Sequence, residues 1–308
     1  MKNPFKTGVR YPMLGAVMIV STTQRRIQTL QGFALYVLGN EQVEVAVVPE
    51  LGGRIISLKN LQTGREWLWH PQTGQKLFTN QPGDAFERSP LLGIDECFPT
   101  IAPGTWQGRQ LPDHGELWSQ AWQVDEARWE QGNLTASLAL ANSPFHFTRA
   151  MEVRGADILL NYEVINLSRR PEVFLWSFHP LFQLQPGDRL QLPESTRQQI
   201  TEADWLEAVD SAVPPGRAAK VFAPAVQVGE AAIRNGHTNE HLTLTWDPEA
   251  NPVLGLWLSR GGWHGHEHFA IEPANGADDC LARAWAQGGG RELAPGSRCR
   301  WWVKIKVG

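Results

Sequence analysis

The stretch "WSFHPLFQL", residues 176–184, reads as an apolar strand that carries one histidine and then one proline. Side chains alternate between the two faces of an extended chain, so the residues here fall into two sets. One face holds Val173, Leu175, Ser177 and His179, and the other holds Phe174, Trp176 and Phe178. His179 therefore ends a row of mostly apolar side chains. Because Pro180 has no N–H to give to a ladder, we expect the strand to leave its sheet there.

Segments with the same two-residue period recur along the whole chain, and helical periodicity is nearly absent. They include GFALYVLG (32–39), VEVAVVP (43–49), LTASLAL (134–140), FHFTRAMEV (145–153), ILLNYEVINL (158–167), HLTLTW (241–246), VLGLWLS (253–259) and CRWWVKIKV (299–307). The best helix candidate is TEADWLEAVDS (201–211), which starts with a capping pair, Thr201 and Asp204. We therefore predict an all-β protein, a large antiparallel β-sandwich with one or two short helices, in which residues 30–308 form a single domain.

Residues 1–29 form the predicted leader, which we expect to be irregular or strand-like. Lys2, Lys6 and Arg10 precede the apolar run MLGAVMIV (13–20), which imitates a signal peptide, yet no A-x-A cleavage pattern follows. The run is also too short to cross a bilayer. The expected location is cytoplasmic, with secretion left as the alternative.

Charge and cysteine content narrow the function classes. The 308 residues carry 28 basic and 32 acidic side chains, a net charge of −4, which does not favour nucleic acid or a membrane surface as a partner. The three cysteines are widely spaced and form no C-x-x-C pair, so neither disulfides nor a zinc motif is indicated. The 14 tryptophans mostly suit a core, although indole faces also bind sugar rings. We expect a small-molecule partner and a monomer or homodimer.

Two further stretches contain side chains that could do chemistry. In LPDHGELWSQAW (111–122), His114 lies in a turn that leads into a tryptophan-rich segment. In HGHEHFAIEPANGADD (264–279), three histidines and Glu272 share one parity. His264, His266 and His268 could converge on one metal ion, as in a cupin-like enzyme, or could simply face solvent at a sheet edge. The chain has no G-x-S-x-G, P-loop or H-E-x-x-H signature.

Taken in order, LPDHG, WSFHPLFQL and IEP resemble the motifs of the aldose 1-epimerase and galactose mutarotase-like superfamily. The opening ELGGRIISLKNLQTGREWLW (50–69) and the ending LAPGSRCRWWVKIKVG (293–308) are also similar to that superfamily. The resemblance implies its β-supersandwich fold and an enzyme that interconverts the α and β anomers of an aldose. It implies Glu272 as the base, His179 as the acid and His114 as a ligand of a sugar hydroxyl.

We also expect Arg54, Asp95 and Trp118 as neighbours of the sugar, with an ion pair for Arg54, a turn cap for Asp95 and a core position for Trp118 as the alternatives. The proposed reaction needs no metal and no cofactor. Within the superfamily, GIDECFPTIAPG (93–104) is similar to the hexose-6-phosphate mutarotases. Two of their basic residues are missing, since Trp118 and the Leu91-Leu92 pair stand in their places. Arginine grips phosphate with two hydrogen bonds and tryptophan cannot, so an uncharged aldose is expected unless Arg88 or Arg109 supplies the charge.

Other functions stay open on the same residues. A carbohydrate-binding or sensing protein would use the same cleft without placing Glu272 opposite His179. A cupin-like metal enzyme would instead need His264, His266 and His268 to converge. A lyase or an isomerase acting on a modified sugar is compatible with the same fold.

Overall fold

The computed structural model describes residues 23–71, 74, 76–200 and 214–308. Strand dominates these residues, and every strand pair is antiparallel. The predicted all-β fold is therefore confirmed. The helix candidate 201–211 and residues 1–22 of the predicted leader lie outside the described residues, while the residues that follow form strand β1 (Gln24–Leu30).

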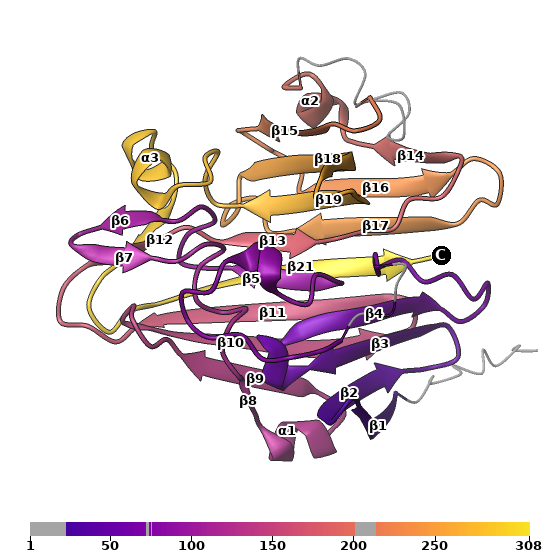
Figure 1. The fold of residues 1–308 in the computed structure, drawn as a ribbon, viewed down its shortest axis with the longest axis horizontal. Helices are drawn as coiled ribbons and strands as arrows, with labels where there is room; N and C mark the ends of the chain where they lie inside the picture. The colour runs from indigo at the N-terminus through magenta and orange to yellow at the C-terminus, as the bar shows by residue number, and fades with distance from the viewer. Residues whose placement is uncertain (1–22, 72–73, 75, 201–213) are drawn as a thin grey trace, which may run out of the picture.

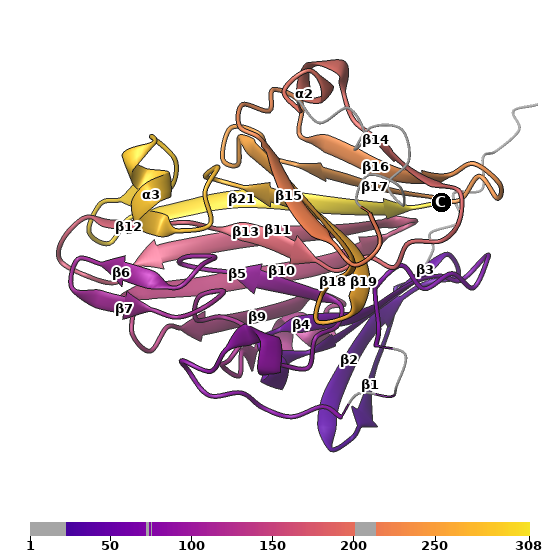
Figure 2. The same ribbon diagram turned by 45° about the horizontal axis from the view of Figure 1, so that its top comes forward.

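Two large sheets make up the fold (Figures 1 and 2). The nine-stranded sheet runs in the order β1, β2 (Phe33–Gly39), β3 (Val43–Val48), β4 (Arg54–Asn60), β5 (Ile94–Cys97), β13 (Ser177–Pro180), β19 (His266–Ala274), β18 (Val253–Trp263) and β15 (Ala218–Ala223). The eight-stranded sheet runs in the order β14 (Asp188–Gln191), β16 (Glu230–Asn235), β17 (His241–Trp246), β21 (Arg298–Val307), β11 (Asp157–Asn166), β10 (Phe145–Arg154), β9 (Leu134–Ala139) and β8 (Gln123–Val124).

Two small sheets and a few short helices complete the described chain. The small sheets pair β12 (Glu172–Phe174) with β20 (Arg291–Leu293), and β6 (Gly104–Trp106) with β7 (Arg109–Leu111). The α-helices of the described residues are α1 (Glu126–Glu130), α2 (Glu194–Arg197) and α3 (Leu281–Ala286), with 3-10 turns η1 (Pro49–Leu51) and η2 (Phe86–Arg88). The described part of the chain contains no helix with the length and apolar character needed to span a bilayer.

The core between the large sheets is built by two-residue alternation. Strands β10 and β11 bury every second side chain, as the sequence pattern predicts. Aromatic rings fill the centre, where Tyr162 stacks on Trp301 with ring centroids 5.4 Å apart and Trp176 meets Trp301 edge-on at 5.0 Å. Full burial of each large apolar side chain contributes about 1.5–3 kcal/mol, so these rings are a major part of the stabilisation.

Strands β5 and β13 lie in the middle of the nine-stranded sheet, between β4 and β19 (Figures 1 and 2). Their register places His179 opposite Asp95 and Ser177 opposite Cys97, so these four side chains share one face. Trp176 and Phe178 pack into the core on the other face, as the alternation predicts. Strand β13 ends at Pro180. The expected exit from the sheet is wrong, because Leu181 donates its N–H to Gly93 and Phe182 exchanges backbone hydrogen bonds with Phe269 of β19.

A buried carboxyl group supports the core face of this strand pair. Glu96, next to Asp95 in β5, accepts hydrogen bonds from the Tyr162 hydroxyl at 2.8 Å and from Trp176 Nε1 at 2.9 Å. Arg149 lies 3.3 Å from it as the counter-charge. Burial raises the pKa of Glu96 to about 7, against the effect of these partners. The strands that carry the candidate site are thus anchored on their far face by polar bonds as well as by packing.

Candidate active site

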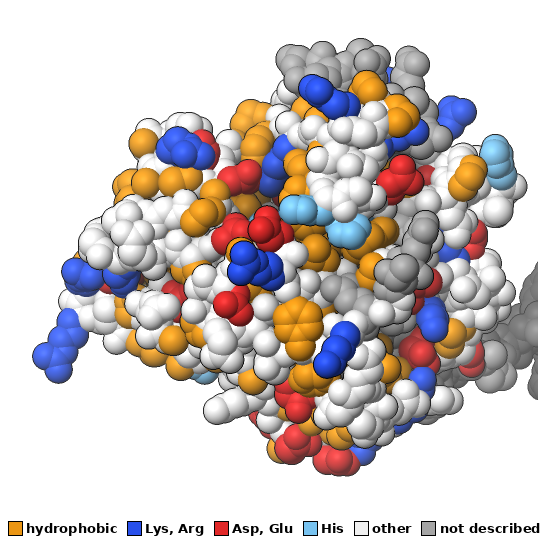
Figure 3. Space-filling view, viewed as in Figure 1, with side chains coloured by type: hydrophobic (Ala, Val, Ile, Leu, Met, Phe, Trp, Pro, Cys, Tyr) orange, Lys and Arg blue, Asp and Glu red, His pale blue; other side chains and the backbone are white. Residues whose placement is uncertain are grey.

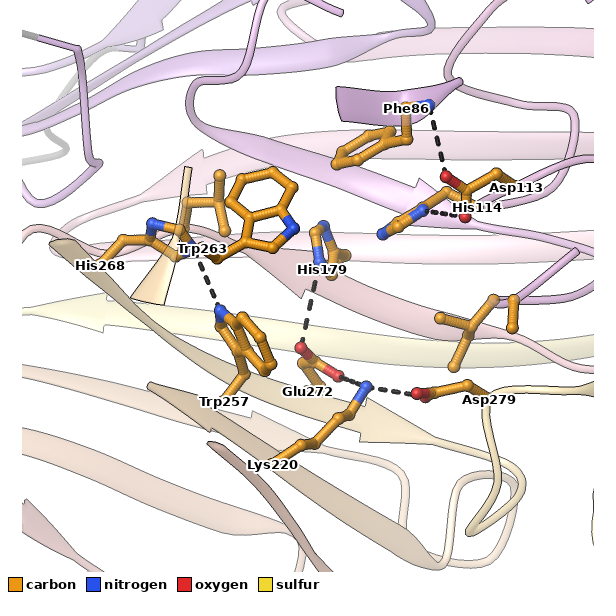
Figure 4. A pocket seen from close by; sticks show the side chains of 13 residues that line it. Phe86, Asp113, His114, His179, Lys220, Trp257, Trp263, His268, Glu272 and Asp279 are labelled. Atoms are coloured by element: carbon orange, nitrogen blue, oxygen red, sulfur yellow. Dashed lines mark hydrogen bonds and ion pairs between the residues drawn. The ribbon is translucent and has the colours of Figure 1, made fainter. Parts of the chain in front are cut away.

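A cavity of about 240 Å³ opens over β13, β15, β18 and β19 of the nine-stranded sheet. Aromatic side chains from two segments line it, namely Phe86 of η2 and Trp257 and Trp263 of β18. The titratable lining side chains are Asp113, His114, His179, Lys220, His268, Glu272 and Asp279 (Figure 4). In the space-filling view, histidine, acidic and basic side chains gather near the middle of this face (Figure 3). Flat rings beside polar groups are typical of a site for a small polar molecule.

Glu272 and His179 face each other across the floor of the cavity. Strand β19 carries Glu272 and β13 carries His179, and Oε1 of the first lies 4.0 Å from Nε2 of the second. Both side chains are almost completely buried. Gly255 in β18 is paired with Glu272, and a Cβ there would lie 3.1 Å from Glu272 Oε2. A glycine at this place therefore leaves the carboxylate the room it occupies.

The second oxygen of Glu272 is held by Lys220. Lys220 Nζ, from β15, lies 2.7 Å from Glu272 Oε2 and 2.8 Å from Asp279 Oδ1 (Figure 4). Burial alone would lower the pKa of Lys220, but the two carboxylates outweigh burial and raise the pKa above its ordinary value. The ammonium group therefore stays charged, and it fixes one oxygen of Glu272 while the other faces His179.

His114 reaches the cavity from a tight turn. Its own φ is 54°, and the next residue, Gly115, has a φ of 72°. A Cβ on Gly115 would lie 2.0 Å from the carbonyl oxygen of Phe98, so only glycine can occupy this position without moving the backbone. The imidazole stacks on Phe86 with centroids 3.8 Å apart, and its Nδ1 lies 2.9 Å from Asp113 Oδ1. Its ring centroid is 5.0 Å from that of His179.

The two imidazoles differ in their surroundings. His179 is buried, and burial lowers its pKa well below the ordinary value, with the charges of His114 and Lys220 adding to the effect. His179 is therefore a neutral imidazole at neutral pH. His114 has a carboxylate partner in Asp113, which can stabilise a positive charge on that ring.

The structure places Arg54, Asp95 and Trp118 behind the lining residues rather than among them. Arg54 Nη2 lies 2.9 Å from Asp95 Oδ1 in an ion pair of which each side chain is 1% exposed. Trp118 donates its indole N–H to the carbonyl oxygen of Asp113 at 2.9 Å and packs edge-on against Phe86. These three residues support the cavity wall from behind.

Neither arginine considered as a phosphate ligand lines the cavity. Arg109, in β7, forms an ion pair with Glu172. Arg88 ends the turn η2 on the protein surface.

The three histidines of the predicted metal array do not converge among the described residues. His264 lies in the turn between β18 and β19 and pairs with Glu87 at 3.4 Å. His266 packs on Trp69, and His268 accepts a hydrogen bond from Trp257 Nε1 at 3.0 Å. Within the described ranges, the histidine and cysteine side chains whose ligand atoms come within 4.8 Å of one another are Cys97, His114 and His179.

Comparison with known proteins identifies the family of the chain. The model of the family described as aldose 1-epimerase matches residues 34–239. The chain belongs to the aldose 1-epimerase family. A comparison with curated proteins finds no match.

Solved structures show the same fold as this member of the aldose 1-epimerase family. A galactose mutarotase-like protein of Clostridium acetobutylicum is 15% identical with a TM-score of 0.71, over 93% of this chain and 98% of that one. A protein of Synechocystis sp. PCC 6803 is 17% identical with a TM-score of 0.65, over 100% and 99%. A galactose mutarotase related enzyme of Lactobacillus acidophilus is 16% identical with a TM-score of 0.63, over 89% and 97%. At such identities these likenesses show the architecture alone.

Several lining residues of this aldose 1-epimerase family member escape prediction from the sequence. Asp113 and Asp279 stand inside the quoted stretches LPDHG and ANGADD, where they read as turn residues. Lys220 sits in the strand AAKVFA (218–223) as one charge among apolar neighbours, a pattern that can mark a buried ion pair. Phe86 comes from a loop with no periodicity, so no sequence signal indicates its contact with His114.

Proposed function

We propose that this member of the aldose 1-epimerase family is a mutarotase that interconverts the α and β anomers of an aldose. The observation that carries the proposal is the pair Glu272 and His179, whose Oε1 and Nε2 atoms lie 4.0 Å apart and face one cavity. Anomer interconversion needs a base for the proton of the C1 hydroxyl and an acid for the ring oxygen. Both oxygens are bonded to the same carbon, so an acid and a base this close together can reach both at once.

The reaction follows from these two groups. Glu272 takes the proton of the C1 hydroxyl, the bond between C1 and the ring oxygen breaks, and His179 protonates that oxygen. Rotation about the bond between C1 and C2, followed by the reverse transfers, closes the ring on the other face of C1. A positioned acid or base typically contributes 10²–10⁴-fold to the rate.

The environment of each imidazole suits a different role. Because burial lowers the pKa of His179, its protonated form is a minor species and a correspondingly strong acid. His114, held by Asp113 and stacked on Phe86, binds a sugar hydroxyl and helps to polarise the ring oxygen. Lys220 keeps Glu272 oriented.

The cavity favours an uncharged sugar over a phosphorylated one. Asp113, Glu272 and Asp279 supply three carboxylates, and Lys220 is neutralised by two of them. No arginine is among the lining residues, so a phosphate would meet negative charge without a bidentate partner. The indole and phenyl faces of Trp257, Trp263 and Phe86 offer apolar surfaces to the C–H face of a sugar ring.

The test is the rate at which freshly dissolved single anomers equilibrate, followed by NMR with and without protein, for glucose, galactose and glucose 6-phosphate. We expect acceleration for a neutral aldose and a loss of at least about a hundredfold in His179→Asn. Equal loss in His114→Asn with full activity in His179→Asn would move the acid role to His114. Saturable sugar binding without faster anomer exchange for any sugar would show that the protein binds sugar and is not a mutarotase. A clear preference for the phosphate would overturn the neutral-sugar proposal.

A further inference from the structure

A third potential metal ligand, Cys97, lies buried beneath the floor of the cavity, beside the two imidazoles. Cys97 is at the end of β5, with its side chain on the same sheet face as His179. The thiol is fully buried, and its sulfur and a ring nitrogen of each of His114 and His179 all lie within 4.8 Å of one another. The mutarotase chemistry proposed above gives this thiol no role.

Each imidazole already has a carboxylate behind it. Nδ1 of His114 lies 2.9 Å from Asp113, and Nε2 of His179 lies 4.0 Å from Glu272. This leaves one nitrogen of each ring for another partner, and Nδ1 of His179 is buried without a hydrogen-bond partner within the described residues. Histidines that bind metal commonly direct their second nitrogen at a carboxylate, which orients the ring. The arrangement therefore has both the inner and the outer groups of a metal site.

We propose that Cys97, His114 and His179 form a binding site for a thiophilic divalent cation, with zinc as the best occupant. One sulfur and two imidazole nitrogens form a donor set that suits zinc, and three protein ligands leave a fourth position open to the cavity. Ligand atoms around a tetrahedral zinc are about 3.3–3.6 Å apart, so ligand atoms that lie within 4.8 Å of one another move closer by up to about 1.5 Å.

Charge favours this cation as well. Binding displaces the proton of the Cys97 thiol, so that a thiolate and a divalent ion add one net positive charge to the floor. Glu272 and Asp113 lie against the two imidazoles and compensate it. Because the ion would occupy nitrogens of both imidazoles, zinc should inhibit the mutarotase. The inhibition rests on the proposed function, whereas the binding itself does not.

Cobalt(II) reports the site without an activity measurement. Titration of the full chain with Co²⁺ should give a near-ultraviolet thiolate-to-cobalt absorption band and the intense visible bands of a tetrahedral ion, and Zn²⁺ should displace both. Cys97→Ala should abolish the near-ultraviolet band, whereas the same change at Cys280, a half-buried cysteine at the start of α3, should leave it intact. Asp113→Asn should weaken metal binding about 10–100-fold by releasing His114.

A measurement on the unaltered protein guards against a folding defect in Cys97→Ala. X-ray absorption at the zinc edge should show one sulfur at about 2.3 Å and nitrogen neighbours at about 2.0–2.1 Å. A shell without sulfur, or a cobalt band that survives Cys97→Ala, overturns the site. If zinc is bound through sulfur but does not change the rate of anomer exchange, the metal site stands and its overlap with the catalytic residues is contradicted. Absence of any anomer exchange in metal-free protein would remove the proposed function and leave the binding result standing.

Discussion

Lys220 and Glu272 form a buried ion pair in which Nζ lies 2.7 Å from Oε2, while the other carboxylate oxygen faces His179 at 4.0 Å. A carboxylate tied at one oxygen presents the second in a fixed direction. Lys220 is itself held in place, because its ammonium nitrogen lies 2.8 Å from Asp279 Oδ1. The base in the proposed mechanism is therefore one member of a three-residue assembly carried by β15, β19 and the segment that follows β19.

Glu272→Gln should abolish anomer interconversion while sugar binding persists, since the amide keeps the shape of the side chain and loses its basicity. Exchange spectroscopy measures the first property and calorimetric titration with sugar the second. Glu267→Gln is the matched control, because Glu267 is exposed on the same strand. Turnover within a few-fold of the parent in Glu272→Gln would refute the assignment of the base.

Lys220→Met should lower kcat about 10–100-fold with a smaller change in KM, because Met replaces the ammonium group while filling similar space and Glu272 then loses its orientation. Steady-state rates on the best sugar separate the two constants. Lys306→Met, at an exposed position on β21, provides the control. A change confined to KM would show that Lys220 binds sugar instead of positioning the carboxylate.

Arg54→Met should destabilise the protein by about 3–5 kcal/mol, because Asp95 would remain as a buried charge without its partner. The second substitution Asp95→Leu should recover most of that loss, because it removes the unpaired buried charge. The native pair is also incompletely satisfied, since Nε and Nη1 of Arg54 lack hydrogen-bond partners within the described residues. Denaturant unfolding of the parent, both single variants and the double variant measures the coupling. Additive losses in the double variant would contradict the buried-pair interpretation.

The stability of the protein should fall at acidic pH partly through His268. Burial lowers the pKa of this imidazole to about 3, with a smaller effect from His266, whereas the ordinary value is 6.5. Between these two values the unfolded chain takes up a proton that the folded chain does not. The free energy of unfolding therefore drops as pH decreases, by at most about 1.4 kcal/mol per pH unit.

His268→Gln tests this dependence, because glutamine retains an acceptor for the indole N–H of Trp257 and does not titrate. Unfolding free energies measured from pH 7 to pH 4 should decline less steeply in the variant than in the parent. Parallel curves for the two proteins would show that His268 is not the group responsible.

The sequence predicts the fold well because the decisive signal is local. Alternation in FHFTRAMEV and ILLNYEVINL is also the burial pattern of β10 and β11, so the buried face can be read residue by residue. Short helices are less visible, since α1 depends on a single cap, Asp125, and buries one tryptophan. A helix of so few residues has no periodic sequence pattern that would predict it within a β-rich chain.

The candidate site is predicted only in part, because its remaining members are set by tertiary contacts. His114, His179 and Glu272 belong to short sequence motifs, and all three line one cavity. Lys220 can be recognised as a site residue only when the sheet order is known, because β15 lies beside β18 and β18 lies beside β19. Arg54 and Asp95, which the sequence suggests as sugar ligands, form a buried ion pair with each other, and this pairing depends on the packing of β4 against β5.

The pairing of β5 with β13 has a consequence for anyone who would alter this protein's specificity by directed evolution. One face of the pair carries Asp95, Cys97 and His179, and the other carries Glu96 and Phe178 in the aromatic interior. Random substitutions in these strands would lower the yield of folded protein, whatever new contacts with the ligand they create. Diversity belongs in exposed positions beside the cavity, such as Glu87 and Arg88, where substitution does not disturb the buried strands.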